Sequence, residues 1–236
     1  MSWLARLFGR SPVLETGLQQ ALARYRALPA VAQTSPLGGL RFVVADVETT
    51  GLNPMTDRLI SIGSVDVDGG KIRLDTAFEV VFRQPSASTN ANILIHGIDG
   101  TTQLSGLEPA AAMLHFLDHV RQAPIVGFHA GFDRMMIDRA SKKAIGEAPS
   151  NPWLDLARLA PALLPEAVTA NEHSLDHWLE KFGIANHARH NALADALATA
   201  QLLQVVLARA TAQGAATLAD LMRIEQEQRW LAQLNR

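Results

Sequence analysis

The sequence predicts an α/β fold in which helices cover a sheet. Three strand-like segments come first and in succession, at residues 41–47, 59–67 and 71–81. A short apolar strand at residues 124–128 follows, between segments with helical periodicity. Several strands in a row, and then strand mixed with helix, are typical of an α/β sheet covered by helices.

The composition is that of a globular chain. Its 236 residues exceed one average domain and fall short of two, and 48% hydrophobic residues can fill a sizeable core. There is no cysteine, which excludes disulfides and thiolate metal sites and fits a reducing compartment. No apolar run reaches the length of a membrane span, and residues 1–10 lack the continuous apolar core of a signal peptide. We therefore expect a cytoplasmic protein without a membrane span.

Charge is unevenly distributed along the chain. Four arginines and one glutamate give residues 1–40 a net charge of +3, and the remainder carries −5, since the whole chain sums to −2. Such an acidic body is poorly suited to following a long duplex through many phosphate contacts. It remains compatible with gripping a chain end, where bound divalent cations neutralise the local charge.

Residues 1–40 are predicted to be a helical extension followed by a linker. Ser11 and Pro12 suit the N-cap and first turn of a helix. Apolar residues then recur at helical spacing: Leu14, Leu18, Leu22 and Tyr25. Residues 33–39 contain serine, proline and glycine and are typical of a linker. An apolar stripe precedes the cap: Trp3, Leu4, Leu7 and Phe8. We expect this stripe to pack on the body or on a protein partner, and a membrane-surface anchor is the alternative.

The remaining elements follow from local signals. The segment 68–70, Asp-Gly-Gly, is a strong hairpin signal between the second and third strands. Helical segments are predicted at residues 108–120, 131–145, 154–164, 174–182, 191–210 and 217–234. Asn191 suits the N-cap of the long alanine- and leucine-rich helix. The expected units are therefore an extension and linker at 1–40, a central domain at 41–210 and a helical tail at 211–236.

Two carboxylates stand two residues apart at the end of the first strand. Side chains alternate along a strand, so Asp46 and Glu48 must point to the same face. Neighbouring anions resist ionising together, and a bound Mg²⁺ or Mn²⁺ relieves their repulsion. Thr49, Thr50 and Gly51 follow and offer a backbone that a ligand can approach closely. A solvated pair of acids at a strand end is the alternative.

Three further residues are candidates from their context. Asp133 enters a helix just after the buried strand, where complementing the helix dipole is an equally good explanation. Asp195 lies in an alanine-rich stretch, where burying a carboxylate is costly unless it is paired or metal-bound. His190 precedes the Asn191 cap and can lean over the acids from that loop, with His187 as a nearby competitor.

The order and spacing of these residues resemble the DEDDh, or DnaQ-like, 3′→5′ exonucleases. That superfamily includes polymerase proofreading subunits, ribonuclease T and oligoribonuclease. Residues 46–65 resemble its first block, residues 95–98 its His-Gly-Ile turn and residues 190–196 its last block. The similarity covers about residues 41–208 and implies a ribonuclease H-like mixed sheet flanked by helices. One departure is His129-Ala130, where family members often carry His-Asn, so substrate grip there is in question.

The resemblance also implies roles for the candidate residues. Four metal ligands would hold two Mg²⁺ or Mn²⁺ on the scissile phosphate: Asp46, Glu48, Asp133 and Asp195. His190 would be the general base that takes a proton from the attacking water. Five residues would bind the terminal nucleotide: Thr49, Thr50, Gly51, Leu52 and His96. For the turn at residues 96–98, a plain loop after the third strand is the alternative.

The implied function is hydrolysis at nucleic-acid 3′ ends with release of nucleoside 5′-monophosphates. Single-stranded DNA is the favoured substrate, with a role in DNA repair or replication. An exoribonuclease of the same family is the alternative, because nothing in the sequence visibly addresses the 2′-OH. An inactive nuclease-like binding module, or a polymerase's proofreading partner, stays open, with residues 1–40 as a candidate surface for a protein partner. Aromatic residues are scarce at 6%, which argues against an extended stacking platform, and we expect Trp153 and Trp178 to be core residues.

Overall fold

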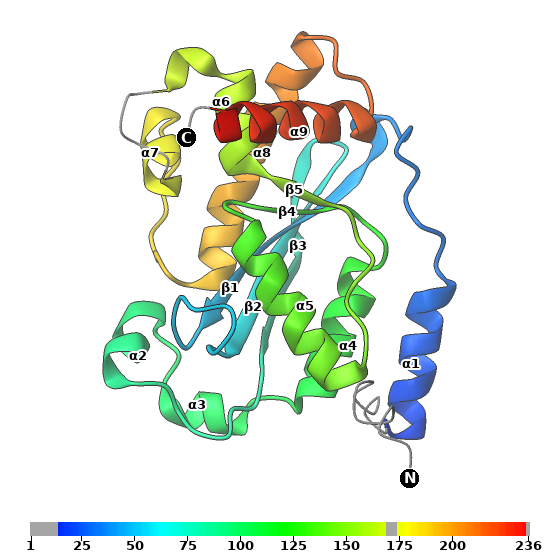
Figure 1. The fold of residues 1–236 in the computed structure, drawn as a ribbon. Helices are drawn as coiled ribbons and strands as arrows, with labels where there is room; N and C mark the ends of the chain where they lie inside the picture. Colours follow the sequence, from blue (N-terminus) through cyan, green and yellow to red (C-terminus); the bar gives the residue numbers. More distant parts are fainter. Residues whose placement is uncertain (1–13, 169–173, 235–236) are drawn as a thin grey trace.

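The computed structural model describes residues 14–168 and 174–234, and they form a mixed five-stranded sheet between helices (Figure 1). The sheet order is β3-β2-β1-β4-β5. The strands are β1 Arg41–Thr49, β2 Leu59–Asp68, β3 Lys71–Val81, β4 Ile125–Gly127 and β5 Trp153–Asp155. β1 pairs antiparallel with β2 and parallel with β4, so the predicted α/β fold with a mixed, ribonuclease H-like sheet is confirmed.

The helices cover both faces of this sheet. The α-helices are α1 Thr16–Ala27, α2 Asn90–His96, α3 Gly100–Ser105, α4 Pro109–Val120, α5 Gly131–Ile145, α6 Leu156–Leu163, α7 Leu175–Lys181, α8 Ala192–Ala212 and α9 Leu218–Leu234. Two short 3₁₀ helices are η2 Leu37–Gly39 and η3 Pro165–Ala167. Alternate residues of β1 join two separate cores. Phe42 and Val44 pack with residues of α6, α8 and α9, and Val43 and Ala45 pack with residues of α1, α4 and α5.

The hairpin between β2 and β3 forms where glycines permit it. Gly69 and Gly70 both have positive φ, at 54° and 75°. Asp68 pairs with Lys71 across this two-residue turn. Two successive positive φ values favour glycine strongly, which is why the sequence signal was correct here.

α8 is the central helix of the molecule. By length and composition alone it could cross a membrane, and it is the one such helix in the described part of the chain. Its buried residues include Leu202, Leu203 and Val206, and it contacts β1 and β2. It is therefore the core helix on one face of the sheet.

The prediction of a helix over residues 154–164 was wrong at its start. Residues 153–155 form β5, which pairs parallel with β4 at the sheet edge. The helix begins only at Leu156, because the Asp155 side chain caps it by accepting a hydrogen bond from the Ala157 N–H at 3.0 Å. The segment after β3 also differs from a plain loop, since Thr89 and Asp99 cap the short helices α2 and α3.

The N-terminal segment departs from the prediction as well. The predicted cap at Ser11-Pro12, and the apolar stripe at 3–8, lie outside the described residues. The helix α1 begins at Thr16, so Leu14 precedes it. The expected linker is tied to the tail, because the Leu37 N–H donates to the Ala216 carbonyl and the Leu218 N–H donates to the Ser35 carbonyl. This segment and the start of α9 therefore lie side by side (Figure 1).

The two tryptophans predicted to be core residues are buried or half-buried, and only some of the apolar residues predicted to pack in the tail helix are buried. Trp178 is buried and Trp153 half-buried. Leu218 and Leu221 of α9 are buried as expected. Leu231, predicted to be an apolar contact of the same helix, is exposed.

Candidate active site

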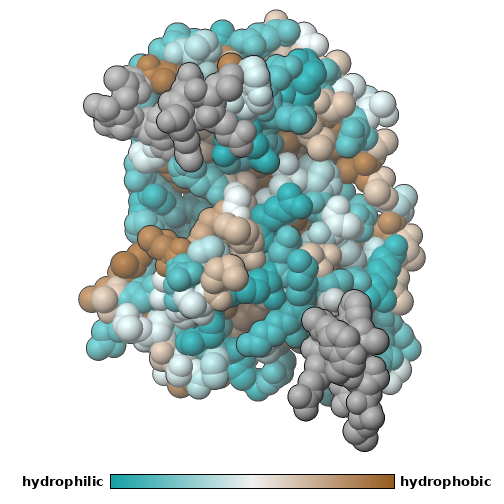
Figure 2. Space-filling view, in the orientation of Figure 1, coloured by the Kyte–Doolittle hydropathy of each residue, from teal (hydrophilic) through white to brown (hydrophobic). Residues whose placement is uncertain are grey.

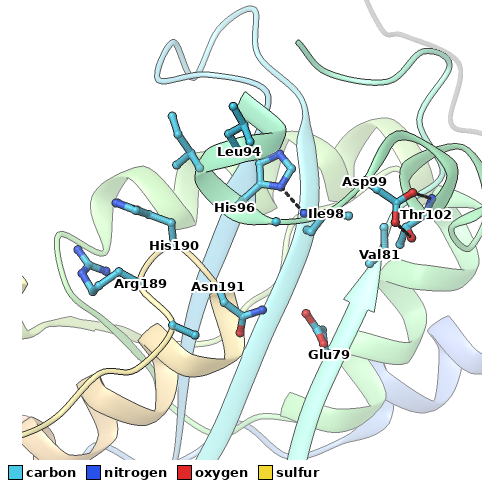
Figure 3. A pocket seen from close by; sticks show the side chains of 13 residues that line it. Glu79, Val81, Leu94, His96, Ile98, Asp99, Thr102, Arg189, His190 and Asn191 are labelled. Atoms are coloured by element: carbon cyan, nitrogen blue, oxygen red, sulfur yellow. Dashed lines mark hydrogen bonds between the residues drawn. The ribbon is translucent and has the colours of Figure 1, made fainter. Parts of the chain in front are cut away.

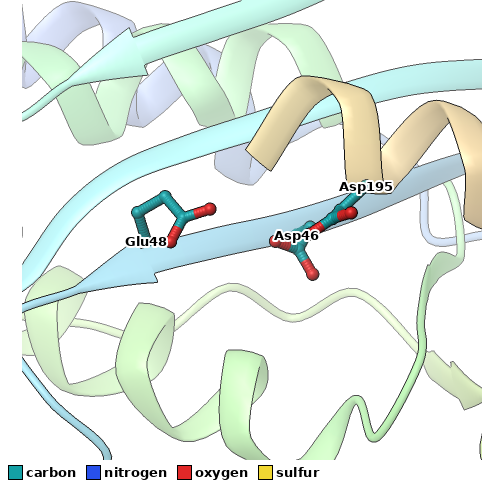
Figure 4. Close-up of side chains that lie close together, drawn as sticks. All are labelled: Asp46, Glu48 and Asp195. Carbon is teal, nitrogen blue, oxygen red and sulfur yellow. The ribbon is translucent and has the colours of Figure 1, made fainter. Parts of the chain in front are cut away.

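Three of the predicted acids meet at the end of β1. Asp46, Glu48 and Asp195 each offer a carboxylate oxygen, and these oxygens all lie within 4.8 Å of one another (Figure 4). Asp46 and Glu48 lie on one face of β1, as strand alternation requires, and Asp195 comes from the first turn of α8. Asp46 and Asp195 are 149 residues apart in the sequence, so tertiary packing brings them together.

A glycine in the neighbouring strand permits this approach. Gly63 of β2 pairs with Asp46, and a methyl group on Gly63 would overlap backbone atoms of Ala192 and Leu193. The absence of a side chain at Gly63 therefore lets the N-terminus of α8 lie directly on the sheet. Our sequence interpretation missed this residue. Its signal was a glycine inside an otherwise apolar strand, which commonly marks close backbone approach.

Asp195 is held by three hydrogen-bond donors from the segment ahead of α8. The Asn186 amide donates to Oδ1 at 2.5 Å, the Arg189 guanidinium to Oδ2 at 2.5 Å and the His190 N–H to Oδ2 at 3.0 Å. Arg189 also forms an ion pair with Asp176, whose Oδ1 lies 2.6 Å from its Nε. The guanidinium thus brings a positive charge to the edge of the acidic cluster.

Asp133 lies beside this group but is not a member of the three-acid cluster. It is buried in the first turn of α5, as its position in the sequence predicted. Its negative charge raises the pKa of Asp46, after the larger effect of burial, so the two carboxylates are electrostatic neighbours. The backbone N–H of Val47 interacts with Asp133 and acts to lower the pKa of Asp133. The structure therefore gathers three of the four predicted ligands and places the fourth next to β1.

Burial makes these acids reluctant to ionise. Burial, followed by the charge of Asp195, raises the pKa of Glu48 to about 8. Burial also raises the pKa of Asp133 to about 7, and that of Asp46 well above its ordinary value. Oε1 of Glu48 is buried without a hydrogen-bond partner among the described residues. An unpartnered buried oxygen among repelling carboxylates fits a hard divalent cation, whose preferred ligands are oxygens.

His190 lies where the sequence predicted, in the loop ahead of the Asn191 cap. The Asn191 side chain accepts a hydrogen bond from the Ala194 N–H at 3.0 Å, which fixes the start of α8. His190 is exposed and has a left-handed φ of 61°. With Arg189 it lines a cavity of about 580 Å³ (Figure 3). The imidazole therefore reaches a space that a ligand can enter.

His96 belongs to a hydrogen-bonded chain that ends at β1. Its Nδ1 accepts from the Ile98 N–H at 2.9 Å, so the protonated Nε2 donates to Asn92 Oδ1 at 2.9 Å. The Asn92 amide in turn donates to the Thr49 carbonyl at 3.0 Å. Burial lowers the pKa of His96, which favours this neutral form. The turn at residues 96–98 is thus the C-terminus of α2, closed by Gly97 with φ of 75°.

The loop after β1 is organised by an aspartate that sequence reasoning passed over. Asp57 Oδ1 accepts from the Thr50 hydroxyl at 3.0 Å, and Oδ2 accepts from the Asn53 N–H at 2.8 Å. A Cβ at Gly51 would collide with the Asp57 carboxylate, so glycine is required for this contact. The loop consequently presents Leu52, whose side chain is 87% exposed. A short polar loop gave no signal that distinguished Asp57 from a solvated acid.

At His129-Ala130, where the sequence departs from the family pattern, the backbone is bound by Asp155. His129 adopts a left-handed φ of 59°, and its N–H donates to Asp155 Oδ1 at 2.9 Å. The negative charge of Asp155 contributes to the raised pKa of Asp133. The end of β5 therefore shapes the turn into α5, a contact that no local pattern could reveal.

Comparison with known proteins agrees with this geometry. The model of the RNase_T family, described as an exonuclease, matches residues 43–203. A DNA polymerase III of the PolC type from Thermotoga maritima is 31% identical over 172 residues, which are 73% of this chain and 12% of that protein. A DNA polymerase III subunit epsilon-like protein from Rhodobacter capsulatus is 32% identical over 198 residues, which are 82% of this chain and 27% of that protein.

Solved structures share the fold. Exonuclease I of E. coli in complex with an oligonucleotide superposes with a TM-score of 0.61 at 22% identity, over 74% of this chain and 42% of that one. A structure of the zinc-bound E. coli enzyme with single-stranded DNA gives 0.60 at 23% identity, over 72% of this chain and 41% of that one. The chain therefore spans less than half of these relatives. Since the family match covers most of the sheet and the whole acidic cluster, the chain belongs to the DnaQ-like RNase_T exonuclease family.

Proposed function

We propose that this protein is a metal-dependent 3′→5′ exonuclease that releases nucleoside 5′-monophosphates. The meeting of Asp46, Glu48 and Asp195 within 4.8 Å supports this function most directly. Two buried carboxylates and one half-buried carboxylate in one place repel each other, and the unpartnered Glu48 oxygen offers a ligand to a cation. A purely structural role would favour pairing this oxygen with a donor from the chain.

The residues of the site have separate tasks in this proposal. Asp46, Glu48 and Asp195 would hold Mg²⁺ or Mn²⁺, with Asp133 as the fourth ligand from beside β1. When bound, two such ions supply an activated water and stabilise the leaving 3′ oxygen. His190 accepts the proton of the attacking water from its position at the cavity wall.

The terminal nucleotide would lie between the loop after β1 and the C-terminus of α2. Asn92 binds the Thr49 carbonyl and Asp57 binds the Thr50 hydroxyl, so the backbone of Thr49 to Gly51 can meet a 3′-OH without reorganising. Leu52 is free to pack against the terminal base. His96 would act through the hydrogen bonds that fix the α2 terminus, because its own ring nitrogens are already engaged.

Single-stranded DNA is the proposed substrate. Relatives from Thermotoga maritima and Rhodobacter capsulatus are DNA polymerase III proteins, and a structural neighbour, E. coli exonuclease I, was solved with single-stranded DNA. We place the activity in the cytoplasm and in DNA repair or replication. Residues 1–40 stay a predicted surface for a protein partner, and the three-part division of the chain stays a prediction too.

The test offers purified protein matched DNA and RNA oligonucleotides with free or blocked 3′ ends. With Mg²⁺ or Mn²⁺ we expect 5′-monophosphates from free DNA 3′ ends only, and no product from the Asp46→Ala variant. Faster hydrolysis of RNA would reassign the substrate. Absence of hydrolysis, together with no metal uptake by calorimetry, would favour the inactive binding module.

A further inference from the structure

A second cavity, of about 500 Å³, lies next to the proposed active site and has a strongly basic wall. It lies between the loop after β1, the end of β3 and the outer face of α5. Four cationic side chains line it: Arg58, Arg83, Arg139 and Lys143. None of its lining residues is acidic, although the whole chain has a net charge of −2. We call this cavity the basic pocket.

Two of these four cations are already fixed by neighbours. Arg83 forms an ion pair with Glu108 at 2.5 Å. Arg58 donates to Gln84 Oε1 at 3.0 Å and to the Ser86 carbonyl at 3.1 Å. These contacts hold the wall that rises from β2 and β3.

The other two cations have no such partner. Arg139 and Lys143 stand four residues apart on α5, so their like charges repel along the helix. Among the described residues neither makes an ion pair or a side-chain hydrogen bond, whereas the neighbouring Arg134 pairs with Asp138. Two adjacent, unneutralised cations at a concave surface favour an anionic ligand.

The basic pocket is directly connected to the proposed active site. Arg58 is bound through its N–H to the Thr50 hydroxyl, at 2.9 Å. Met136, on the pocket floor, lies one helical turn after Asp133. Along α5, Arg139 and Lys143 lie about 9 and 15 Å beyond Asp133, given a rise of 1.5 Å per residue. This range places both cations several ångströms to one side of the acidic cluster, where a strand continues beyond its terminal nucleotide.

Exposed apolar side chains occur at both cavities, with Met55 lining the basic pocket and Leu94 lining the cavity at His190. Leu52 and Met55, in the loop after β1, are 87% and 78% exposed. Leu94 of α2 is 85% exposed and lines the cavity at His190. Figure 2 shows hydrophobic residues gathered on the left of the view, where Figure 1 has α2 and the loop after β1, with mostly hydrophilic residues to their right, over α5. Bases can pack on such a rim while their phosphates face the cations.

We infer that the basic pocket binds the phosphate backbone of a single strand upstream of the 3′ end that is cleaved. This inference rests on the proposed function, because it takes the neighbouring acidic cluster to be the exonuclease active site. It assigns Arg139 and Lys143 to substrate binding, with Met55 as an apolar contact for an upstream base. Cleavage of the last bond does not require them, so they act on the affinity for long strands.

The test measures binding without turnover. A labelled single-stranded oligonucleotide of 12 nucleotides is titrated with protein in EDTA over a series of salt concentrations. We expect the variant Arg139→Gln/Lys143→Gln to lose affinity at low salt. Its slope of log K against log salt should fall by about 1.4, because each phosphate contact contributes about 0.7 for single strands.

A matched control removes the same charge elsewhere. Lys142 lies on α5 outside the basic pocket, and Lys181 lies at the end of α7, and both are exposed. The variant Lys142→Gln/Lys181→Gln should keep the wild-type slope. Lys143→Glu, a single reversal at an exposed position, changes the charge by the same two units and should also weaken binding, so it guards against misfolding of the double variant. The double variant should melt no lower than wild type, because a repulsion is removed.

A kinetic arm separates this inference from the proposed function. With Mn²⁺, the pocket variant should raise KM for the 12-nucleotide strand and leave turnover of a dinucleotide unchanged. An unchanged salt slope in the variant, or no oligonucleotide binding by the wild type, would overturn the inference even if hydrolysis is observed. A reduced slope without any hydrolysis would sustain the basic pocket and reject the nuclease function.

Discussion

Gly63 of β2 lies directly beneath Leu193, so closely that a methyl group on the glycine would overlap the backbone of the helix. The contact places the first turn of α8, with Asp195, over the β1 residues Asp46 and Glu48. The absence of a side chain at Gly63 therefore sets how closely Asp195 of α8 approaches Asp46 and Glu48 of β1. The proposed active site depends on this close packing as well as on its carboxylates.

The first prediction concerns that contact. Gly63→Ala should destabilise the protein by about 1–3 kcal/mol, the usual cost of overpacking a core, and should lower Tm accordingly. Because α8 must move away, metal affinity and activity should fall as well. Gly17→Ala is the control, since nothing lies within 4 Å of a Cβ at that helical position. A Gly63→Ala protein with wild-type metal affinity would show that the close approach is not needed.

The second prediction concerns Arg189, which shares Asp195 with any bound cation. Arg189→Gln should destabilise the metal-free protein by on the order of 1–3 kcal/mol, less than a fully buried pair because the arginine is partly exposed. It should also strengthen Mg²⁺ or Mn²⁺ binding, since a competing cation is removed. Thermal melts with EDTA and with metal should show a lower starting Tm and a larger metal-induced rise. Arg73→Gln, which breaks an exposed pair with Asp75, should change neither quantity.

The third prediction concerns pH. Burial raises the pKa of Glu48 from its ordinary value of 4.5 to about 8, and that of Asp133 from 3.8 to about 7. At a pH between the ordinary and the raised value, the folded protein therefore binds more protons than the unfolded chain. The free energy of unfolding of the metal-free protein should therefore fall as pH rises from about 5 to about 8. Bound metal should flatten this fall, because it stabilises the anions and displaces protons. Melts across this range in EDTA and in Mg²⁺ test both statements, and Glu48→Gln should reduce the slope in EDTA.

The fourth prediction concerns the first acid. Asp46→Ala should abolish hydrolysis and metal uptake, because it removes the carboxylate that interacts with all three other acids of the site. The metal-free variant should be at least as stable as wild type, since a buried repelling charge is lost. Calorimetric titration with Mn²⁺ and a thermal melt in EDTA give the two readouts. A variant that is inactive only because it is unfolded would contradict this interpretation.

Local sequence patterns predicted most of the fold, because strand alternation, turns and helix caps depend on residues that are close together in the sequence. Strand alternation placed Asp46 and Glu48 on one face, and the Asn191 cap marked the start of α8. The three-residue strand β5 gave no such pattern, since it is too short to show alternation and is defined by its pairing with β4. Asp57 contacts Thr50, which is only seven residues away, but a polar residue in a loop gives no sign of such a contact. The contacts of Gly63 and Asp155 join distant segments, so no short window of sequence contains both partners. For the same reason the sequence could not show that Asp133 lies beside the three-acid cluster instead of within it.

The last prediction concerns His190 and must separate its imidazole from its backbone. The His190 N–H holds Asp195, and the residue has a left-handed φ of 61°. His190→Asn tolerates this conformation and keeps the N–H, so metal affinity and Tm should stay at the wild-type values. Hydrolysis should nevertheless fall by roughly 10²–10⁴-fold, the typical contribution of a general base, with the loss in kcat. His190→Ala should lose as much activity and some stability, and His187→Ala, at an exposed neighbouring position, should lose neither. If His190→Asn hydrolysed a labelled oligonucleotide at the wild-type rate, another group must take the proton from water.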